Sequence, residues 1–284
     1  MQQPKMGGQS VTRLFIKGNE ELADALLSQA DGGSRLDKGV RESVQAVHDG
    51  KFEIEVVWET AVSTDILLQQ LNGTPFPAEL KAQDLDDAFL TNQFESKLFS
   101  ADSDLIVLSI QPDMLYTRWR HQGDGTLICP PLDWQQSWSA AQRDWFMQNF
   151  SPVGKLSADE YKESLTDLIH ALKEQTKAHI MLVGVSSFDP DDQTHSFHGI
   201  DDTLTLRAHR FNLVMLELSY SEGITFIDVD RLLAELGCDD HVQKALAYSD
   251  AAYRAICDDF VRVMTDVSFF EERPILVQMG QRKR

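Results

Sequence analysis

Four short polar stretches of the sequence carry side chains that serve in acyl chemistry. They are Gly18-Asn19-Glu20, Val62-Ser63-Thr64, Gln111-Pro112-Asp113 and Asp250-Ala251-Ala252-Tyr253. In acyl transfer, carboxylates and hydroxyls act as nucleophiles, acids or bases, and N–H groups stabilise the developing oxyanion. If the fold brings these stretches to one edge, they form a candidate site for an acyl or ester group.

Five apolar runs predict the strands that must position this site. They are Thr12–Ile16, Phe52–Trp58, Leu105–Ile110, His179–Val185 and Thr225–Asp228. Each is short, mostly apolar on both faces and followed by a turn and a helix, which is typical of buried parallel strands. The sequence therefore predicts an α/β fold with a doubly wound, mostly parallel five-stranded sheet flanked by helices. Ligands of such sheets bind at the carboxyl ends of the strands.

Helices are predicted between and after these strands. Their ranges are Glu20–Gln29, Thr64–Leu71, Asp84–Lys97, Trp134–Asn149, Ser157–Thr176, Leu204–Glu222 and Asp250–Thr265. The predicted loops Asp31–Gly39, Asn72–Pro77 and Gly123–Pro131 are too short to be domain linkers. We expect a single domain over residues 1–284, with residues 1–11 flexible.

The order and spacing of these stretches resemble the SGNH/GDSL hydrolase family over about residues 12–267. The family's Gly-Asp-Ser block corresponds to Gly18-Asn19-Glu20, and Thr64 stands at the glycine of its second block. Its Gly-x-Asn-Asp block corresponds to Ile110-Gln111-Pro112-Asp113, and its Asp-x-x-His block to Asp250-Ala251-Ala252-Tyr253. The resemblance implies a flavodoxin-like, three-layer SGNH sandwich with catalytic positions at Glu20, Asp250 and Tyr253.

The side chains at these positions differ from those that serine hydrolysis needs. Tyrosine has an ordinary pKa near 10, so Tyr253 is a poor substitute for an imidazole base. Pro112 has no side-chain donor for an oxyanion, whereas Thr64 still offers its backbone N–H. We therefore expect a degenerate member that binds an acyl or ester-like small molecule, or an accessory protein in a bacterial biosynthetic pathway.

Two alternatives remain open at this point. One is an active esterase, acyl hydrolase or acyltransferase that uses Glu20, Asp250 and a loop histidine; the other is an interaction subunit that binds another enzyme. The candidate ligand-binding residues are Gly18, Asn19, Ser63, Thr64, Gln111, Asp113, Trp119, His195 and His198. A structural interpretation of the first stretch is also available, because Asn19 is a favoured helix N-cap and Glu20 complements the helix dipole.

The loop from Phe188 to Asp202 concentrates acidic residues around His195 and His198. It is interpreted mainly as a solvated acidic loop, because a zinc site needs a third ligand in a definite geometry. We expect no metal and no cofactor. Other nucleophile types at or near strand ends, Ser63, Ser109, Ser186, Ser187 and Cys129, are expected to serve in turns, in caps or in the core.

Aromatic residues concentrate between residues 116 and 150. They are Tyr116, Trp119, Trp134, Trp138, Trp145, Phe146 and Phe150. Trp134, Trp138 and Trp145 have the spacing of one helix face, which favours core packing. The alternative is an insertion or lid over the site in which Arg118 and Arg120 hold an anionic group.

Composition limits the classes of partner. The formal charge of −19 repels nucleic acid and anionic lipid, so neither nucleic acid nor a membrane is an expected partner. Three widely spaced cysteines favour reduced thiols, and no signal peptide is recognisable, so we expect a cytoplasmic protein.

Overall fold

The computed structural model describes residues 10–83, 92–130, 136, 138–192, 203–244 and 246–270. Its centre is a parallel sheet of β1 (Ser10–Lys17), β2 (Phe52–Glu59), β3 (Leu105–Ser109), β7 (His179–Val183) and β8 (Thr225–Ile227). The strands lie in the order β2-β1-β3-β7-β8, and every neighbouring pair is parallel. This arrangement confirms the predicted doubly wound, five-stranded α/β fold.

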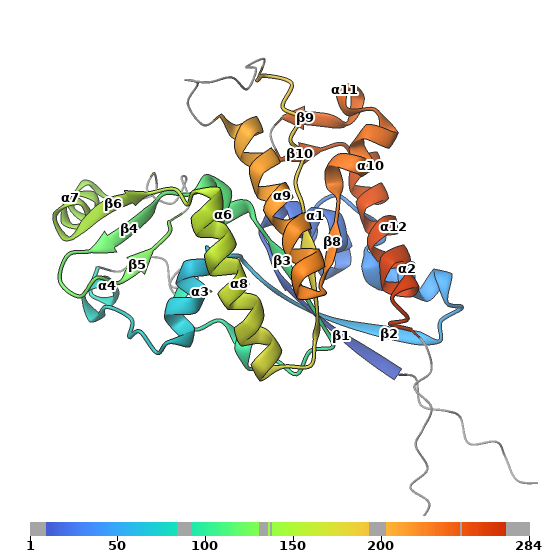
Figure 1. Ribbon diagram of the computed structural model, residues 1–284, viewed down its shortest axis with the longest axis horizontal. Coiled ribbons are helices and arrows are strands. Elements are labelled where there is room, and N and C mark those ends of the chain that lie inside the picture. The colour runs from blue at the N-terminus through green and yellow to red at the C-terminus, as the bar shows by residue number, and fades with distance from the viewer. Residues whose placement is uncertain are drawn as a thin grey trace, which may run out of the picture.

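Helices cover both faces of this sheet (Figure 1). One face is covered by α1 (Glu20–Leu26), α2 (Val40–Val47), α10 (Val229–Leu236) and α12 (Asp250–Asp266). The other face is covered by α3 (Thr64–Leu71), α8 (Ala158–Gln175) and α9 (Leu204–Glu222), joined by the short α6 (Gln111–Leu115). Neighbouring residues of a strand point to opposite faces, so Leu14 and Ile16 join the first core and Phe15 joins the second.

A smaller antiparallel sheet lies to one side of the main sheet (Figure 1). It contains β4 (Arg118–His121), β5 (Leu127–Ile128) and β6 (Phe150–Gly154), and α7 (Ala140–Asn149) leads directly into β6. Trp138, Phe146 and Phe150 form a separate apolar cluster here. The segment predicted as an insertion therefore has its own sheet and core. Core packing is confirmed for Trp138, and Trp145 packs partly buried against the same cluster. Trp134 lies outside the described residues, and use of the segment as a lid stays a prediction.

Short elements complete the chain. They are η1 (Gln29–Asp31), α4 (Ala78–Lys81), η2 (Lys97–Phe99), α11 (Cys238–His241), β9 (Val242–Lys244) and β10 (Ala247–Tyr248). Strands β9 and β10 form an antiparallel hairpin immediately before α12.

Capping serines explain two departures from the predicted helix bounds, at the starts of α7 and α8. Helix α7 begins at Ala140, not at Trp134, because the Ser139 hydroxyl accepts a hydrogen bond from the Gln142 amide (3.2 Å) and caps it. Ser157 caps α8 in the same way. Helix α1 ends at Leu26 and does not reach Gln29, and the predicted helix Asp84–Lys97 lies largely outside the described residues.

Two kinds of feature are absent from the described residues. None of the helices there combines the length and the apolar character that crossing a bilayer requires. In the same part of the chain, no three His, Cys, Asp or Glu side chains are grouped so that they could share a metal ion.

Candidate functional site

Asn19 links the carboxyl ends of three strands. It follows Gly18, whose N–H donates to Glu59 O (3.0 Å) and whose carbonyl accepts from Trp58 Nε1 (2.8 Å). The Asn19 side chain accepts from Ala61 N (3.0 Å) and donates through Nδ2 to Gln111 Oε1 (2.7 Å). The structure therefore brings together Gly18, Asn19 and Gln111, three of the residues predicted to bind a ligand.

The same contacts correct one interpretation of the first turn. Asn19 does stand at the N-cap position of α1, but its side chain makes no capping bond. Its carboxamide is instead directed to the loops that follow β2 and β3, where it satisfies a buried backbone amide. A Cβ at position 18 would lie 2.8 Å from Leu22 Cβ, so a larger residue here would force α1 to shift.

Glu20 and Glu21 have opposite environments. Glu20 is exposed, at the position of the family's serine. Glu21 is buried, and Ser109 Oγ at the end of β3 donates to its Oε1. Burial raises the pKa of Glu21 to about 7, although the Ser109 bond acts in the opposite direction.

Glu21 is thus a site residue that the sequence reasoning missed. The signal was present in the helical period, because position 21 lies four residues before the buried Ala25 on the inward face of α1. Its second oxygen, Oε2, is buried and has no hydrogen-bond partner among the described residues. A half-satisfied carboxyl group therefore lies directly beneath the edge of the sheet.

Thr64 and Asp113 form a second buried pair, between α3 and α6. Thr64 donates to Asp113 Oδ1 through its amide (2.8 Å) and its hydroxyl (3.0 Å), and the hydroxyl also lies 2.9 Å from Ser164 Oγ on α8. Burial raises the pKa of Asp113 to about 8, although the bond from the Thr64 amide acts in the opposite direction. The backbone N–H that Thr64 was expected to offer to an oxyanion is therefore occupied by Asp113.

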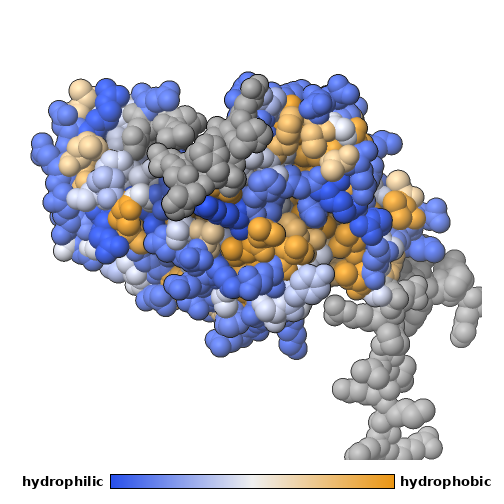
Figure 2. Space-filling view, turned by 45° about the horizontal axis from the view of Figure 1, so that its top comes forward, coloured by the Kyte–Doolittle hydropathy of each residue, from blue (hydrophilic) through white to orange (hydrophobic). Residues whose placement is uncertain are grey.

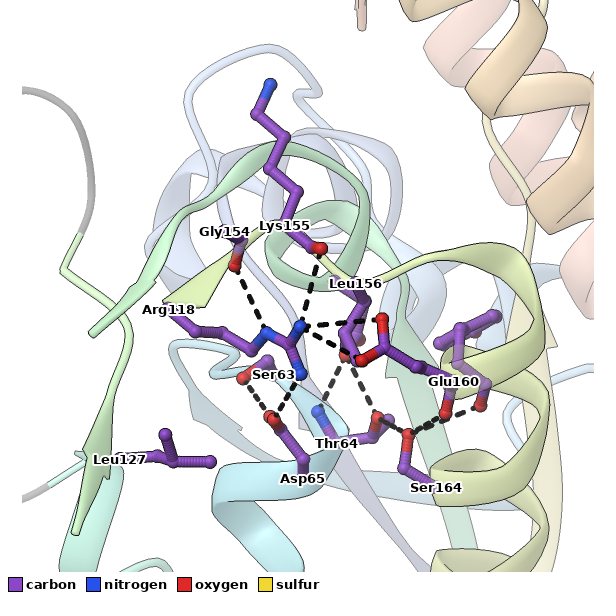
Figure 3. Close-up of polar contacts among 12 residues, drawn as sticks. Ser63, Thr64, Asp65, Arg118, Leu127, Gly154, Lys155, Leu156, Glu160 and Ser164 are labelled. Carbon is purple, nitrogen blue, oxygen red and sulfur yellow. Dashed lines mark hydrogen bonds and ion pairs between the residues drawn. The ribbon is translucent and has the colours of Figure 1, made fainter. Parts of the chain in front are cut away.

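Arg118 fastens the small sheet to the main body (Figure 3). Its guanidinium group donates to Asp65 Oδ2 (3.1 Å) at the start of α3, to Glu160 Oε1 (3.4 Å) on α8 and to Gly154 O (3.2 Å) on β6. Ser63 Oγ donates to the other Asp65 oxygen (2.6 Å). Arg118 is buried and paired with acids of its own chain, so its contacts are structural, whereas Arg120 is exposed.

Asp250 and Tyr253 do not lie as a catalytic pair. Asp250 is exposed and lies 3.8 Å from Arg35 NH1. Tyr253 is buried in the face of α12 that joins the core, and its hydroxyl accepts from Tyr248 N (3.4 Å). Burial raises the pKa of Tyr253 further. Among the described residues, no hydrogen bond or ion pair connects Glu20 with either of them.

A serine and a histidine do meet at the start of α12. His241 Nδ1 lies 2.7 Å from Ser249 Oγ, and the same hydroxyl accepts from Ala252 N (3.2 Å) as the helix cap. Both side chains are half-buried. The sequence reasoning did not find this pair, because its members are eight positions apart and meet only through the β9–β10 hairpin.

The remaining candidates lie elsewhere or are not described. Trp119 is in the small sheet, where its ring packs against Phe146 with ring centres 5.1 Å apart. Cys129 is buried, and burial raises the pKa of its thiol, so the thiol is inert. His195 and His198 lie outside the described residues, so their part in the site stays a prediction.

Two cavities lie toward the opposite, amino-terminal edge of the sheet. Their volumes are about 280 Å³, between β1, β2 and the loop before β3, and about 430 Å³, between that loop and the end of α8. Neither is lined by a predicted site residue.

The sequence matches no family model and no curated protein. The fold, however, is similar to solved structures. A catalytic mutant of an acetylxylan esterase from Geobacillus stearothermophilus has 16% sequence identity and a TM-score of 0.51, covering 91% of this chain and 95% of that chain. An alpha/beta hydrolase enzyme from the metagenome of Lake Arreo, Spain, has 14% identity and a TM-score of 0.50, covering 89% and 95%.

A lipolytic protein of the G-D-S-L family from Veillonella parvula aligns at 12% identity with a TM-score of 0.45, covering 90% of this chain and 99% of that chain. At identities this low, the likeness to solved structures concerns the fold alone. The two structures with TM-scores of 0.51 and 0.50 bear out the α/β fold that the sequence resemblance implied.

Proposed function

We propose that this chain, which has the SGNH/GDSL-like fold, is a non-hydrolytic protein that binds a small acyl or ester-like ligand at the carboxyl edge of its sheet. One observation carries the proposal. The Tyr253 hydroxyl, at the position of the family's base, is buried and accepts a backbone hydrogen bond, while Glu20 and Asp250 are exposed and separate. A serine-type mechanism needs a nucleophile and a base in contact, and these three positions do not supply them.

The polar groups that remain at this edge suit a carbonyl ligand. Gln111 is half-buried, and its Oε1 is held by Asn19. No hydrogen bond from its Nε2 is found within the described part of the chain, so Nε2 can donate to a ligand carbonyl. Tyr116, within 3.5 Å of Asn19 through its hydroxyl, lies beside it. The exposed carboxylate of Glu20 favours a neutral ligand over an anionic one. A protein of this kind suits an accessory role in a cytoplasmic, bacterial biosynthetic pathway.

Binding and hydrolysis are tested separately. Acetylated xylo-oligosaccharide, chosen because an acetylxylan esterase shares the fold, is titrated by calorimetry, and p-nitrophenyl acetate reports turnover. We expect measurable binding without turnover. Gln111→Glu keeps the oxygen that Asn19 needs and removes the N–H donor, so it should weaken binding about tenfold, as expected for one lost hydrogen bond.

Gln175→Glu, an exposed change of the same charge at the end of α8, is the matched control and should bind as the parent does. Equal binding by both variants, or turnover well above the uncatalysed rate, would contradict the proposal. Thermal unfolding of each variant shows whether the fold is kept.

The alternative of an active hydrolase has one specific observation in its favour, the contact between His241 and Ser249. In that case a fluorophosphonate probe should label Ser249. Ser249→Asn retains a good N-cap and lacks the nucleophile, so it should abolish labelling without unfolding α12. Absence of label on the parent protein favours the binding function.

A further inference from the structure

Helix α12 delivers the chain to the outer side of β2, the side away from β1. The helix runs toward the amino edge of the main sheet, where Thr265 Oγ1 lies 3.2 Å from His48 Nε2. Just after the helix, the Phe270 ring packs against Phe52, which begins β2, with ring centres 5.2 Å apart (Figure 1). Residues 271–284 follow this point in the sequence. No other strand of the described residues pairs with β2 on its outer side.

The handedness of the crossovers indicates where a strand that follows α12 should lie. From β1 the chain passes through α1 and α2, on the face that α12 also covers, and moves outward to β2. From β2 to β8 it passes over the other face, by α3, α8 and α9, and moves in the opposite direction. These crossovers therefore share one hand, as parallel sheets almost always require. A strand reached through α12 keeps this hand only if it lies on the outer side of β2.

The sequence after Phe270 contains a run that suits such a strand. Residues 274–279 read Pro-Ile-Leu-Val-Gln-Met, which is mostly apolar and has its proline at the first position, where a strand tolerates it. Residues 271–273 span about 10 Å when extended, or about two strand spacings, which is enough to reach the outer side of β2. We propose that residues 274–279 pair with β2 as a sixth strand of the main sheet. Because the chain arrives at the start of β2, the added strand is parallel to it.

Apolar side chains beside β2 are left uncovered by the described residues. Val40, Val44 and Val47 form one stripe of α2, in steps of four and three residues. Val40 and Val44 are buried, whereas Val47, at the end of α2 that leads to β2, is 61% exposed. On β2, Val57 is 41% and Trp58 is 38% exposed. Figure 2 shows apolar residues at the surface on the side where α2 and α12 lie in Figure 1. A sixth strand would cover such side chains on both faces of the sheet, since Val57 and Trp58 point to opposite faces.

The charges of the segment are complementary to those of β2. Glu53 and Glu55 are exposed on this strand. Glu55 lies 3.6 Å from Arg13, and Glu53 has no ion pair within the described part of the chain. Residues 273–284 contain no acid and four cations, which are Arg273, Arg282, Lys283 and Arg284. A second copy of the chain carries a net charge of −19 and is repelled as a whole, which favours the chain's own basic segment as the occupant.

Hydrogen exchange of the full chain, resolved by residue, tests the proposal. Alternate amides of residues 275–279 face β2 and should exchange at least about tenfold more slowly than in a synthetic peptide of residues 271–284. Leu276→Pro combined with Val277→Pro removes one N–H of each orientation and should abolish this protection. The outward amides of β2 should then also exchange faster. Gly280→Pro combined with Gln281→Pro, outside the run, is the matched control and should keep the protection.

Four outcomes would overturn the proposal. The first is exchange of residues 275–279 as fast as in the peptide, and the second is equal protection in the two double variants. The third is protection that grows with protein concentration, since the segment would then pair with a second copy. The fourth is protection of the outward amides of β2 that is lost on deletion of residues 1–9 and not in Leu276→Pro, Val277→Pro. Thermal unfolding of each variant shows that the main fold is kept.

Discussion

Replacing Asp113 by asparagine tests whether a buried, protonated carboxyl group helps to hold α3 and α6 together. The change keeps an oxygen for the Thr64 amide and removes the titrating group. The pKa of Asp113 rises from 3.8 to about 8, chiefly because burial disfavours its charged form. At 1.36 kcal/mol for each pKa unit, ionising the folded carboxyl costs about 6 kcal/mol relative to the unfolded chain.

The sign of the pH dependence follows from this shift. Because the folded state holds the proton more tightly than the unfolded state, this contribution to stability falls as the pH rises from about 4 to about 8. The parent protein should lose about 4 kcal/mol relative to Asp113→Asn between about pH 5 and about pH 8. Glu21 titrates in both proteins and cancels in the comparison.

Urea unfolding at the two pH values measures the difference, and Asp144→Asn, an exposed carboxyl on α7, is the control. A difference between parent and Asp113→Asn that is the same at both pH values would refute the argument. So would a control that behaves like the variant.

Three further substitutions test separate contacts. Lys17→Met should destabilise the fold by about 2 kcal/mol, because it removes the buried cation that pairs with the half-buried Glu59 (3.0 Å). Adding Glu59→Gln should recover most of this loss in a denaturant titration. Arg118→Lys removes the guanidinium group whose hydrogen bonds join α3, α8 and β6. Backbone hydrogen exchange in the small sheet should become faster, and the free energy of unfolding should fall by about 2 kcal/mol. The exposed Arg120→Lys should show neither effect. Tyr253→Phe should lower the free energy of unfolding by about 1 kcal/mol, because the buried Tyr248 amide loses its hydrogen-bond acceptor. If binding of acetylated xylo-oligosaccharide also becomes weaker, the hydroxyl has more than a structural role.

The main sheet could be predicted from the sequence because its signals are local and strong. Five short apolar runs separated by helical stretches predict parallel strands, and all five strands lie within about two residues of the predicted bounds. The expectation that all are buried is wrong for β2, which is mostly exposed because it forms a border of the sheet. The bounds of α3 and α9 agree to the residue. The small sheet was not predicted, because β4 reads Arg-Trp-Arg-His and its two arginines obscure the alternation of apolar and polar residues that marks a strand. Arg118 points inward only because Asp65 and Glu160 neutralise its charge.

The candidate site was predictable in position and not in detail. The polar stretches after β1, β2 and β3 do converge, as their place after parallel strands implied. The sequence did not show whether Glu20 or Glu21 points inward, because a helix rotation of one residue exchanges the two. It did not show the partner of Thr64 either, because that depends on where α6 packs. The contact between His241 and Ser249 requires the β9–β10 hairpin, which no local sequence pattern predicted.

Strand β2 forms one border of the main sheet, and no other strand of the described residues pairs with it on that side. Such borders invite other chains to add strands and begin fibrillar growth. Glu53 and Glu55 are exposed along β2, so an incoming copy in register would bring rows of negative charge together. The negative charge along β2 thus disfavours edge-to-edge polymerisation of this chain. Replacing both glutamates by threonine should shorten the time to precipitation during prolonged agitation.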